Sequence, residues 1–318
     1  MGKHFKKFVF FTTAAAAGMY TLNRVVDYTA GMKNLLKTDN GETYHWKQGD
    51  IFYTKSGNGS PLLLVHDLNP ASSNMEWDKI IRKLEKSYTV YAIDLLGCGR
   101  SEKPGITYTS FLYVQLMNQF IQDVIGETAS VVATGASTSF VIMAQAMAPD
   151  NFKNIILINP DSIQSLKAAP EREQKIAKGF LEIPILGTFL YNLQMHEKKI
   201  HSYFEKKYFL KKSLISSKME DTYFESAHKG KSAGKYLLAS AQGNYINVDV
   251  SNAVKNAKNL YIISSRERKD AISITEEYLH LNKNIEVSYL SNSKYLPQLE
   301  VPDKLFGILS MFLQSNTI

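Results

Sequence analysis

A segment rich in small and hydroxyl residues, VVATGASTSF at residues 131–140, holds the candidate nucleophile. The nucleophilic serine of many hydrolases stands on a strained turn from a strand into a helix, with small residues two positions to either side. Ser137 fits this pattern, because Gly135 and Ser139 flank it. A second register, counted directly from the strand, puts Gly135 itself at the turn. Both registers stay open, as does a third interpretation in which the hydroxyls of residues 137–139 only cap the helix.

A serine nucleophile also needs a general base and an acid that orients the base. The last histidine of the chain, His280, lies in the helix-like segment EEYLHL, so the C-terminal region offers no imidazole. The remaining histidines are His4, His45, His66, His196, His201 and His228. A histidine from residues 196–228 reaching the nucleophile is the alternative that keeps a base available.

Metal and cofactor chemistry find no support in the sequence. There is no His-Glu-x-x-His motif and no cluster of metal ligands, and Cys98 is the single cysteine. The net charge of +7 comes partly from lysine pairs at 198–199, 206–207 and 211–212, which no nucleic-acid motif accompanies. We therefore expect no cofactor, no metal and no nucleic acid, and we interpret the lysine pairs as a solvated helix face.

The elements that must position these residues alternate between strands and helices. Short apolar runs predict parallel strands at 62–66, 89–94, 130–134, 154–159, 259–264 and 285–290. Amphipathic helices are expected between them at 76–86, 111–125 and 139–148, and Gly126 is expected to end the second one. This alternation predicts an α/β fold with a mostly parallel central sheet and flanking helices.

Three landmarks give the sequence a specific resemblance. LLLVHDL at 62–68 is followed by DLLGCGRS at 94–101, and the C-terminal part contains YLPQLEVPDKL from Tyr295. In this order and spacing they resemble the α/β-hydrolase family, with its His-Gly after one strand and D-x-x-G-x-G-x-S after the next. The resemblance runs from about residue 48 to 314 and implies that fold, with a helical cap inserted late in the chain.

The resemblance also implies a degenerate catalytic triad. Tyr295 stands where the family has its histidine, and Arg268 stands where the family has its acid. Glu267, Asp270 and Asp161 are alternative acids. In the Ser137 register, the oxyanion hole would use the backbone N–H groups of Leu68 and Thr138. Asp67 replaces the glycine that follows the family's histidine, which puts a carboxylate beside that hole.

The resemblance divides the chain into a core at 48–160 and 252–318 and a helical cap at 161–251. The cap is rich in aromatic residues, which are expected either to pack in its own core or to line a pocket for a small hydrophobic or ester-like ligand: Phe180, Phe189, Tyr191, Tyr203, Phe204, Tyr208, Phe209, Tyr223 and Phe224.

Residues 1–36 are expected to form a hydrophobic or amphipathic helix. An uncharged run from Phe8 to Asn23 lies between lysines and Arg24. We interpret residues 8–23 as a single membrane anchor, with a cleaved signal peptide of a secreted protein, or an arm that docks on the domain, as alternatives.

Two functions from different classes follow. One is a membrane-associated binding protein with little or no catalysis, because two triad positions are replaced. The other is an active serine hydrolase of ester or amide bonds that uses Ser137 and a non-standard base.

Overall fold

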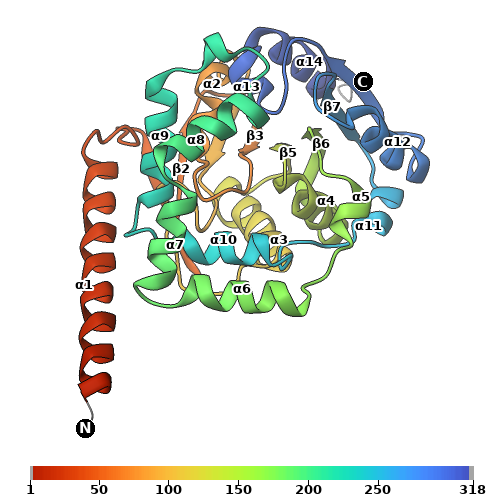
Figure 1. Cartoon of the computed structure of the whole chain (residues 1–318). Helices are drawn as coiled ribbons and strands as arrows, with labels where there is room; N and C mark the ends of the chain where they lie inside the picture. The colour runs from red at the N-terminus through yellow and green to blue at the C-terminus, as the bar shows by residue number, and fades with distance from the viewer. Residues whose placement is uncertain (1–2, 315–318) are drawn as a thin grey trace.

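The computed structural model describes residues 3–314, in which eight strands form one sheet in the order β1-β2-β4-β3-β5-β6-β7-β8 (Figure 1). The strands are β1 (Gly41–Trp46), β2 (Gly49–Ser56), β3 (Ser60–Val65), β4 (Tyr88–Ile93), β5 (Ala129–Thr134), β6 (Phe152–Ile158), β7 (Leu260–Ser265) and β8 (Glu286–Leu290). The strands β3 to β8 pair in parallel, and the hairpin β1–β2 adds an antiparallel edge. The predicted parallel sheet is therefore confirmed.

Helices cover both faces of the sheet. One face packs against α3 (Ser110–Phe120), α4 (Ser137–Met147), α11 (Ser251–Asn256) and α12 (Ala271–Leu281), and the other against α2 (Asp78–Leu84) and α14 (Pro302–Gln314). Within β3, Leu63 and Val65 enter the first core, whereas Leu62 and Leu64 enter the second. Side chains alternate along a strand, so a continuous apolar run is what a sheet covered on both faces requires.

Short elements complete the core. They are η1 (Asn74–Trp77), η2 (Ile121–Ile125), η3 (Pro149–Asn151) and α13 (Pro297–Glu300). The π-helical turn η2 continues α3 and ends at Gly126, whose backbone is left-handed with φ of 77°. The predicted helix end at this glycine is therefore found in the structure.

The segment between β6 and β7, called the insertion here (residues 161–251), is helical. It contains α5 (Ile163–Leu166), α6 (Arg172–Glu182), α7 (Leu186–Gln194), α8 (Glu197–Tyr203), η4 (Phe204–Tyr208), η5 (Lys212–Leu214), α9 (Ser217–His228) and α10 (Lys235–Gln242). Five of its aromatic residues are buried in one cluster, which also takes in Tyr295 and Leu299 of the core: Tyr191, Phe204, Tyr208, Phe209 and Tyr223. These five pack rather than line a pocket. The role of the insertion as a cap stays a prediction.

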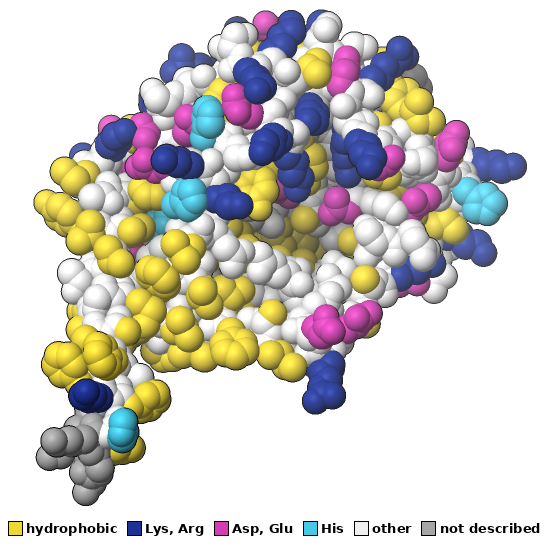
Figure 2. All heavy atoms as spheres, in the orientation of Figure 1, with side chains coloured by type: hydrophobic (Ala, Val, Ile, Leu, Met, Phe, Trp, Pro, Cys, Tyr) yellow, Lys and Arg dark blue, Asp and Glu magenta, His cyan; other side chains and the backbone are white. Residues whose placement is uncertain are grey.

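The N-terminal helix α1 (Lys3–Gly31) runs along one side of the molecule, and its first half projects beyond the body (Figure 1). Apolar side chains cover the projecting part (Figure 2). The second half is held by polar contacts to the insertion. The Asn23 amide donates to the carbonyl of Ile185 (3.0 Å), and the Ser232 hydroxyl donates to Asp27 (2.5 Å). The Leu35 N–H just beyond the helix donates to Glu225 (2.6 Å).

The prediction of a membrane-spanning helix at residues 8–23 is wrong. Across residues 3–314, no helix combines the length and the apolar character that crossing a bilayer demands. The run of uncharged residues suggested an anchor, but four alanines and several hydroxyl side chains make it only weakly apolar. Nothing in the structure bears on the alternative of secretion.

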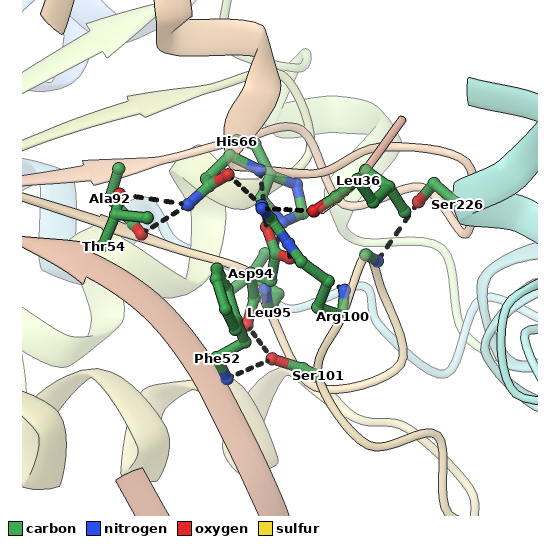
Figure 3. A network of polar contacts seen from close by, with 12 residues as sticks. Leu36, Phe52, Thr54, His66, Ala92, Asp94, Leu95, Arg100, Ser101 and Ser226 are labelled. Atoms are coloured by element: carbon green, nitrogen blue, oxygen red, sulfur yellow. Dashed lines mark hydrogen bonds and ion pairs between the residues drawn. The ribbon is translucent and has the colours of Figure 1, made fainter. Parts of the chain in front are cut away.

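A buried ion pair between Asp94 and Arg100 joins four parts of the fold (Figure 3). The Arg100 Nε donates to Asp94 (2.7 Å), and the same carboxylate accepts the backbone N–H of Asn74 (2.6 Å). Arg100 also donates to the carbonyl of Leu36 (3.1 Å) and lies over the Phe52 ring at 4.0 Å. Burial alone would raise the pKa of Asp94, but the charge and hydrogen bonds of Arg100 hold it below its usual value.

We expect Arg100→Met to lower the free energy of unfolding by about 3–5 kcal/mol, because it leaves Asp94 buried without its partner. The double variant Asp94→Asn/Arg100→Met should lose less than the sum of the two single variants. Urea denaturation measures both, with the exposed Arg82→Met as the control that stays within about 0.5 kcal/mol of wild type. A strictly additive pair of losses would contradict the coupling.

Candidate functional site

The turn from β5 into α4 has Gly135 at its apex. Gly135 has φ of 59°, and its N–H donates to the carbonyl of Ile158 in the neighbouring strand (3.0 Å). This left-handed backbone is the strained conformation that a nucleophile adopts at a strand-to-helix turn. The geometry therefore favours the register with Gly135 at the nucleophile position, where no side chain is available.

Ser137 lies two residues further, in the first turn of α4, and its side chain is fully buried. Its hydroxyl donates to the carbonyl of His66 at the end of β3 (2.5 Å). Thr138 does not present a free N–H either, since it donates to the carbonyl of Gly135 (3.2 Å). The Ser137 hydroxyl thus links α4 to the end of β3, and the Thr138 N–H closes the first turn of α4. The helix already begins at Ser137, whereas an elbow at Ser137 requires the helix to begin after it.

The carboxylate of Asp67 fills the space beside the turn. It accepts the N–H of Ala136 at 2.9 Å, the residue directly after the apex. A Cβ placed on Gly135 would lie 2.3 Å from the Asp67 Oδ1 and 2.8 Å from the Tyr295 hydroxyl, so neither could stay in place. Family oxyanion holes use the N–H after the nucleophile together with one from the loop after β3. Asp67 therefore occupies the position of the oxyanion.

The charge state of Asp67 follows from the same contacts. Burial raises the pKa of Asp67 to about 6, against the opposing effects of the Lys207 charge and the backbone N–H groups of Ala136 and Leu68. Leu68 was predicted as an oxyanion donor, and here it favours the carboxylate. Asp67 is thus mostly ionised at neutral pH, and its carboxylate lies where the oxyanion of a reaction intermediate would bind.

Tyr295 lies beside this turn, and Arg268 lies next to Tyr295. Tyr295 is buried and stacks on Tyr208, with ring centroids 5.5 Å apart, and Arg268 lies 5.5 Å from its ring centroid. Burial raises the pKa of Tyr295 well above its usual value, so the phenol stays protonated at neutral pH and cannot act as a general base. Arg268 donates to the carbonyl of Pro160 (2.7 Å) and lies 3.5 Å from Asp161.

The alternative bases and acids are engaged elsewhere. On the insertion, His201 pairs with Glu220 (2.6 Å), His196 caps α8, and the Nδ1 of His228 contacts the carbonyl of Phe224 (2.8 Å). Glu267 accepts the N–H of Asn292 (2.9 Å), and Asp270 is exposed at the start of α12. Among the described residues, the side chains nearest Gly135 are those of Asp67 and Tyr295, so the cluster of Gly135, Asp67, Tyr295 and Arg268 defines the candidate site.

A second buried carboxylate, Glu76, lies behind Asp67. It accepts the hydroxyl of Tyr223 (2.8 Å), the amide of Gln298 (3.3 Å) and, more weakly, the N–H of Asp67 (3.4 Å). Burial, and then the charge of Asp67, raise the pKa of Glu76 to about 8. Sequence reasoning noticed Asp67 as a substitution for glycine but missed Glu76, because nothing in its local sequence distinguishes it from a helix-surface glutamate.

A groove of about 760 Å³ lies away from this site. It is lined by residues at or before the starts of β6 and β7, among them Asp150, Lys153, Asp249 and Lys258. Ligands of open α/β sheets bind outside the carboxyl ends of the strands, and this groove is at the amino ends. A hollow of about 580 Å³ instead opens at the carboxyl ends, over Tyr295 and Arg268.

Comparison with known proteins agrees with this fold. The family described as the alpha/beta hydrolase fold matches residues 61–261, which is more than half of the chain. The chain therefore belongs to the α/β-hydrolase family.

Two curated relatives match parts of the chain. A 2-hydroxy-6-oxo-6-(2'-aminophenyl)hexa-2,4-dienoic acid hydrolase of Metapseudomonas resinovorans is 35% identical over 71 residues, which is 22% of this chain and 24% of that protein. A haloalkane dehalogenase of Agrobacterium fabrum is 27% identical over 130 residues, 40% of this chain and 42% of that protein. The chain thus spans less than half the length of either relative.

Solved structures match over more of the chain. Cfl2 of Burkholderia cenocepacia superposes with a TM-score of 0.70 at 14% identity, over 86% of this chain and 95% of that one. A structure described as a membrane phospholipase A superposes with a TM-score of 0.69 at 18% identity, over 98% of both chains. At these identities the likeness establishes the fold alone.

We expect Gly135→Ala to lower the free energy of unfolding by about 2–4 kcal/mol, since the new Cβ must displace Asp67 and strain the backbone. Gly126→Ala is the matched control, because Gly126 is also left-handed but nothing lies within 4 Å of a Cβ there. It should cost about 1 kcal/mol. In an Asp67→Gly background the cost of Gly135→Ala should shrink. Urea denaturation of wild type and of the four variants checks this, and equal costs at both glycines would refute the close approach.

The raised pKa of Glu76 predicts how the stability of the protein changes with pH. Folding raises its pKa from 4.5 to about 8, so over that range the folded protein keeps a proton that the unfolded chain releases. The contribution of Glu76 to the free energy of unfolding therefore falls as pH rises from about 4.5 to about 8 and is level above that. Relative to wild type, Glu76→Gln should gain stability between pH 5 and pH 9 in urea titrations. The exposed Glu127→Gln is the control, and a constant difference for Glu76→Gln would contradict the shift.

Proposed function

We propose that this chain is a binding protein built on the α/β-hydrolase fold, with no catalysis or very weak catalysis at the family's site. The carboxylate of Asp67, bound to the Ala136 N–H beside Gly135, is the observation that carries the proposal. Two requirements of acyl transfer are therefore missing. Gly135 gives the apex no nucleophile, and the N–H that would stabilise an oxyanion already binds the Asp67 carboxylate.

Electrostatics oppose turnover further. An oxyanion forming beside the ionised Asp67 would be repelled, and at a separation of a few ångströms in a buried site this costs several kcal/mol at an effective dielectric constant near 20. The positive Arg268 stands where a family enzyme orients an imidazolium with a negative charge. Removing one triad member typically costs about 10⁴-fold, and the members act as a unit, so several replacements leave little activity.

An active hydrolase that uses Ser137 with a non-standard base is the competing function. The relatives support it, because the two named above are described as a hydrolase and a dehalogenase. The contacts of Ser137 oppose it, since its hydroxyl is buried and donates to the carbonyl of His66. The two functions differ in whether Ser137 reacts.

Labelling with a fluorophosphonate probe separates them. We expect no labelling of wild type beyond that of heat-denatured protein, and no hydrolysis of short p-nitrophenyl esters above that background. Ser137→Ala should leave both readouts unchanged while it lowers the free energy of unfolding by about 1–2 kcal/mol, because His66 loses its hydrogen bond. A known serine hydrolase run in parallel shows that the probe is active. Labelling of wild type that Ser137→Ala abolishes would overturn the proposal.

A further inference from the structure

The hollow above Tyr295 and Arg268 has an unusual charge. Its lining contains six cationic side chains and a single carboxylate: Lys199, Lys206, Lys207, Lys294, Arg268 and Lys269, with Asp161. They come from three places in the sequence, namely α8 with η4, the loop between β7 and α12, and the loop after β8. Figure 2 shows lysine and arginine side chains gathered around a hollow on this face.

Within residues 3–314, none of these five lysines forms an ion pair. Asp161, the one carboxylate of the lining, is already contacted by Arg268 at 3.5 Å. The Lys207 ammonium lies 4.8 Å from the centroid of Tyr295 and contacts no carboxylate. Lys294 donates to the backbone carbonyl of Lys206, so its ammonium is held at η4 without a carboxylate partner. The lining therefore has positive charge that the protein itself does not neutralise.

An aromatic stack leads from this surface to the site. Tyr203 stacks on Tyr208 with centroids 6.3 Å apart, and Tyr208 stacks on Tyr295. Tyr203 is 48% exposed and lines the hollow, whereas the other two are buried. A planar group of a ligand could therefore stack against Tyr203 while its charged groups lie among the lysines.

From this juxtaposition we propose that the hollow binds a small organic anion that carries two or more phosphate groups. Lysine and arginine are the side chains that recognise phosphate through charge-assisted hydrogen bonds. A volume of about 580 Å³ suits a small molecule better than a polymer, which needs an extended basic track. A purely hydrophobic or neutral ester-like ligand would leave these cations unpartnered.

This inference rests on the proposed function only in treating the hollow as the mouth of a binding site. It replaces the hydrophobic ligand expected from the sequence by an anionic one. The two ideas fail separately, since fluorophosphonate labelling tests catalysis and phosphate binding tests the hollow.

The experiment is isothermal titration of the full chain with ATP and with inorganic tripolyphosphate, without added metal, at low and at high NaCl. We expect one binding event per chain for both probes, weaker binding of AMP, and a loss of affinity as salt rises. Lys206→Gln/Lys207→Gln should weaken binding by about tenfold or more, since two charged contacts are removed.

Lys198→Gln is the matched control. Lys198 also lies on α8 and is exposed, but it lines a different pocket, with Glu197 and Asp221. It should bind as wild type does. Thermal unfolding of each variant verifies the fold. Binding of neither probe, equal affinity in the double variant and the control, or binding of poly-uridine RNA without binding of the small probes would each overturn the proposal.

Discussion

The buried pair of Asp94 and Arg100 sets the position of the candidate site through His66. The backbone N–H of Leu95, next to Asp94, donates to the Nε2 of His66 (3.0 Å), which leaves the Nδ1 as the donor to the carbonyl of Asp67 (2.7 Å). Burial lowers the pKa of His66 to about 4, so the ring stays neutral and keeps this tautomer at neutral pH. The loop that carries Asp67 is thereby fixed by an ion pair in the loop that follows the adjacent strand, β4.

The same histidine connects to the turn at β5. Its carbonyl accepts the hydroxyl of Ser137, so the end of β3 and the start of α4 are held in register. This arrangement of the backbone places the Asp67 carboxylate within hydrogen-bond distance of the Ala136 N–H. The fold thus keeps the strained turn of a hydrolase, while glycine relieves the strain and a carboxylate takes the hydrogen bond that catalysis would use.

The sequence was sufficient for the strands because short apolar runs covered on both faces are a local signal. The assignment of Arg268 and Tyr295 to the family's acid and histidine positions stays a prediction, although the two side chains do lie together after neighbouring strands. The elbow register stayed open, although a glycine at the apex tolerates the left-handed backbone better than a serine does. The hydrogen bond between Asp67 and Ala136 could not be deduced from the sequence, because it depends on β3 and β5 lying side by side. The N-terminal helix was misjudged because its uncharged run is only weakly apolar, and its contacts to Ile185 and Ser232 join residues that are distant in sequence.

Negative and positive charge lie in different places at this site. Beneath the tyrosine stack lies the buried carboxylate of Asp67, and the partly exposed Asp161 lines the hollow. The charge of Lys207 opposes the rise in pKa that burial causes in both acids. The cations of the lining outnumber these two carboxylates. An enzyme that forms an oxyanion needs free hydrogen-bond donors at the turn itself. Here the turn binds the Asp67 carboxylate and the full positive charges line the hollow, an arrangement that fits the proposed binding of an anion better than its transformation.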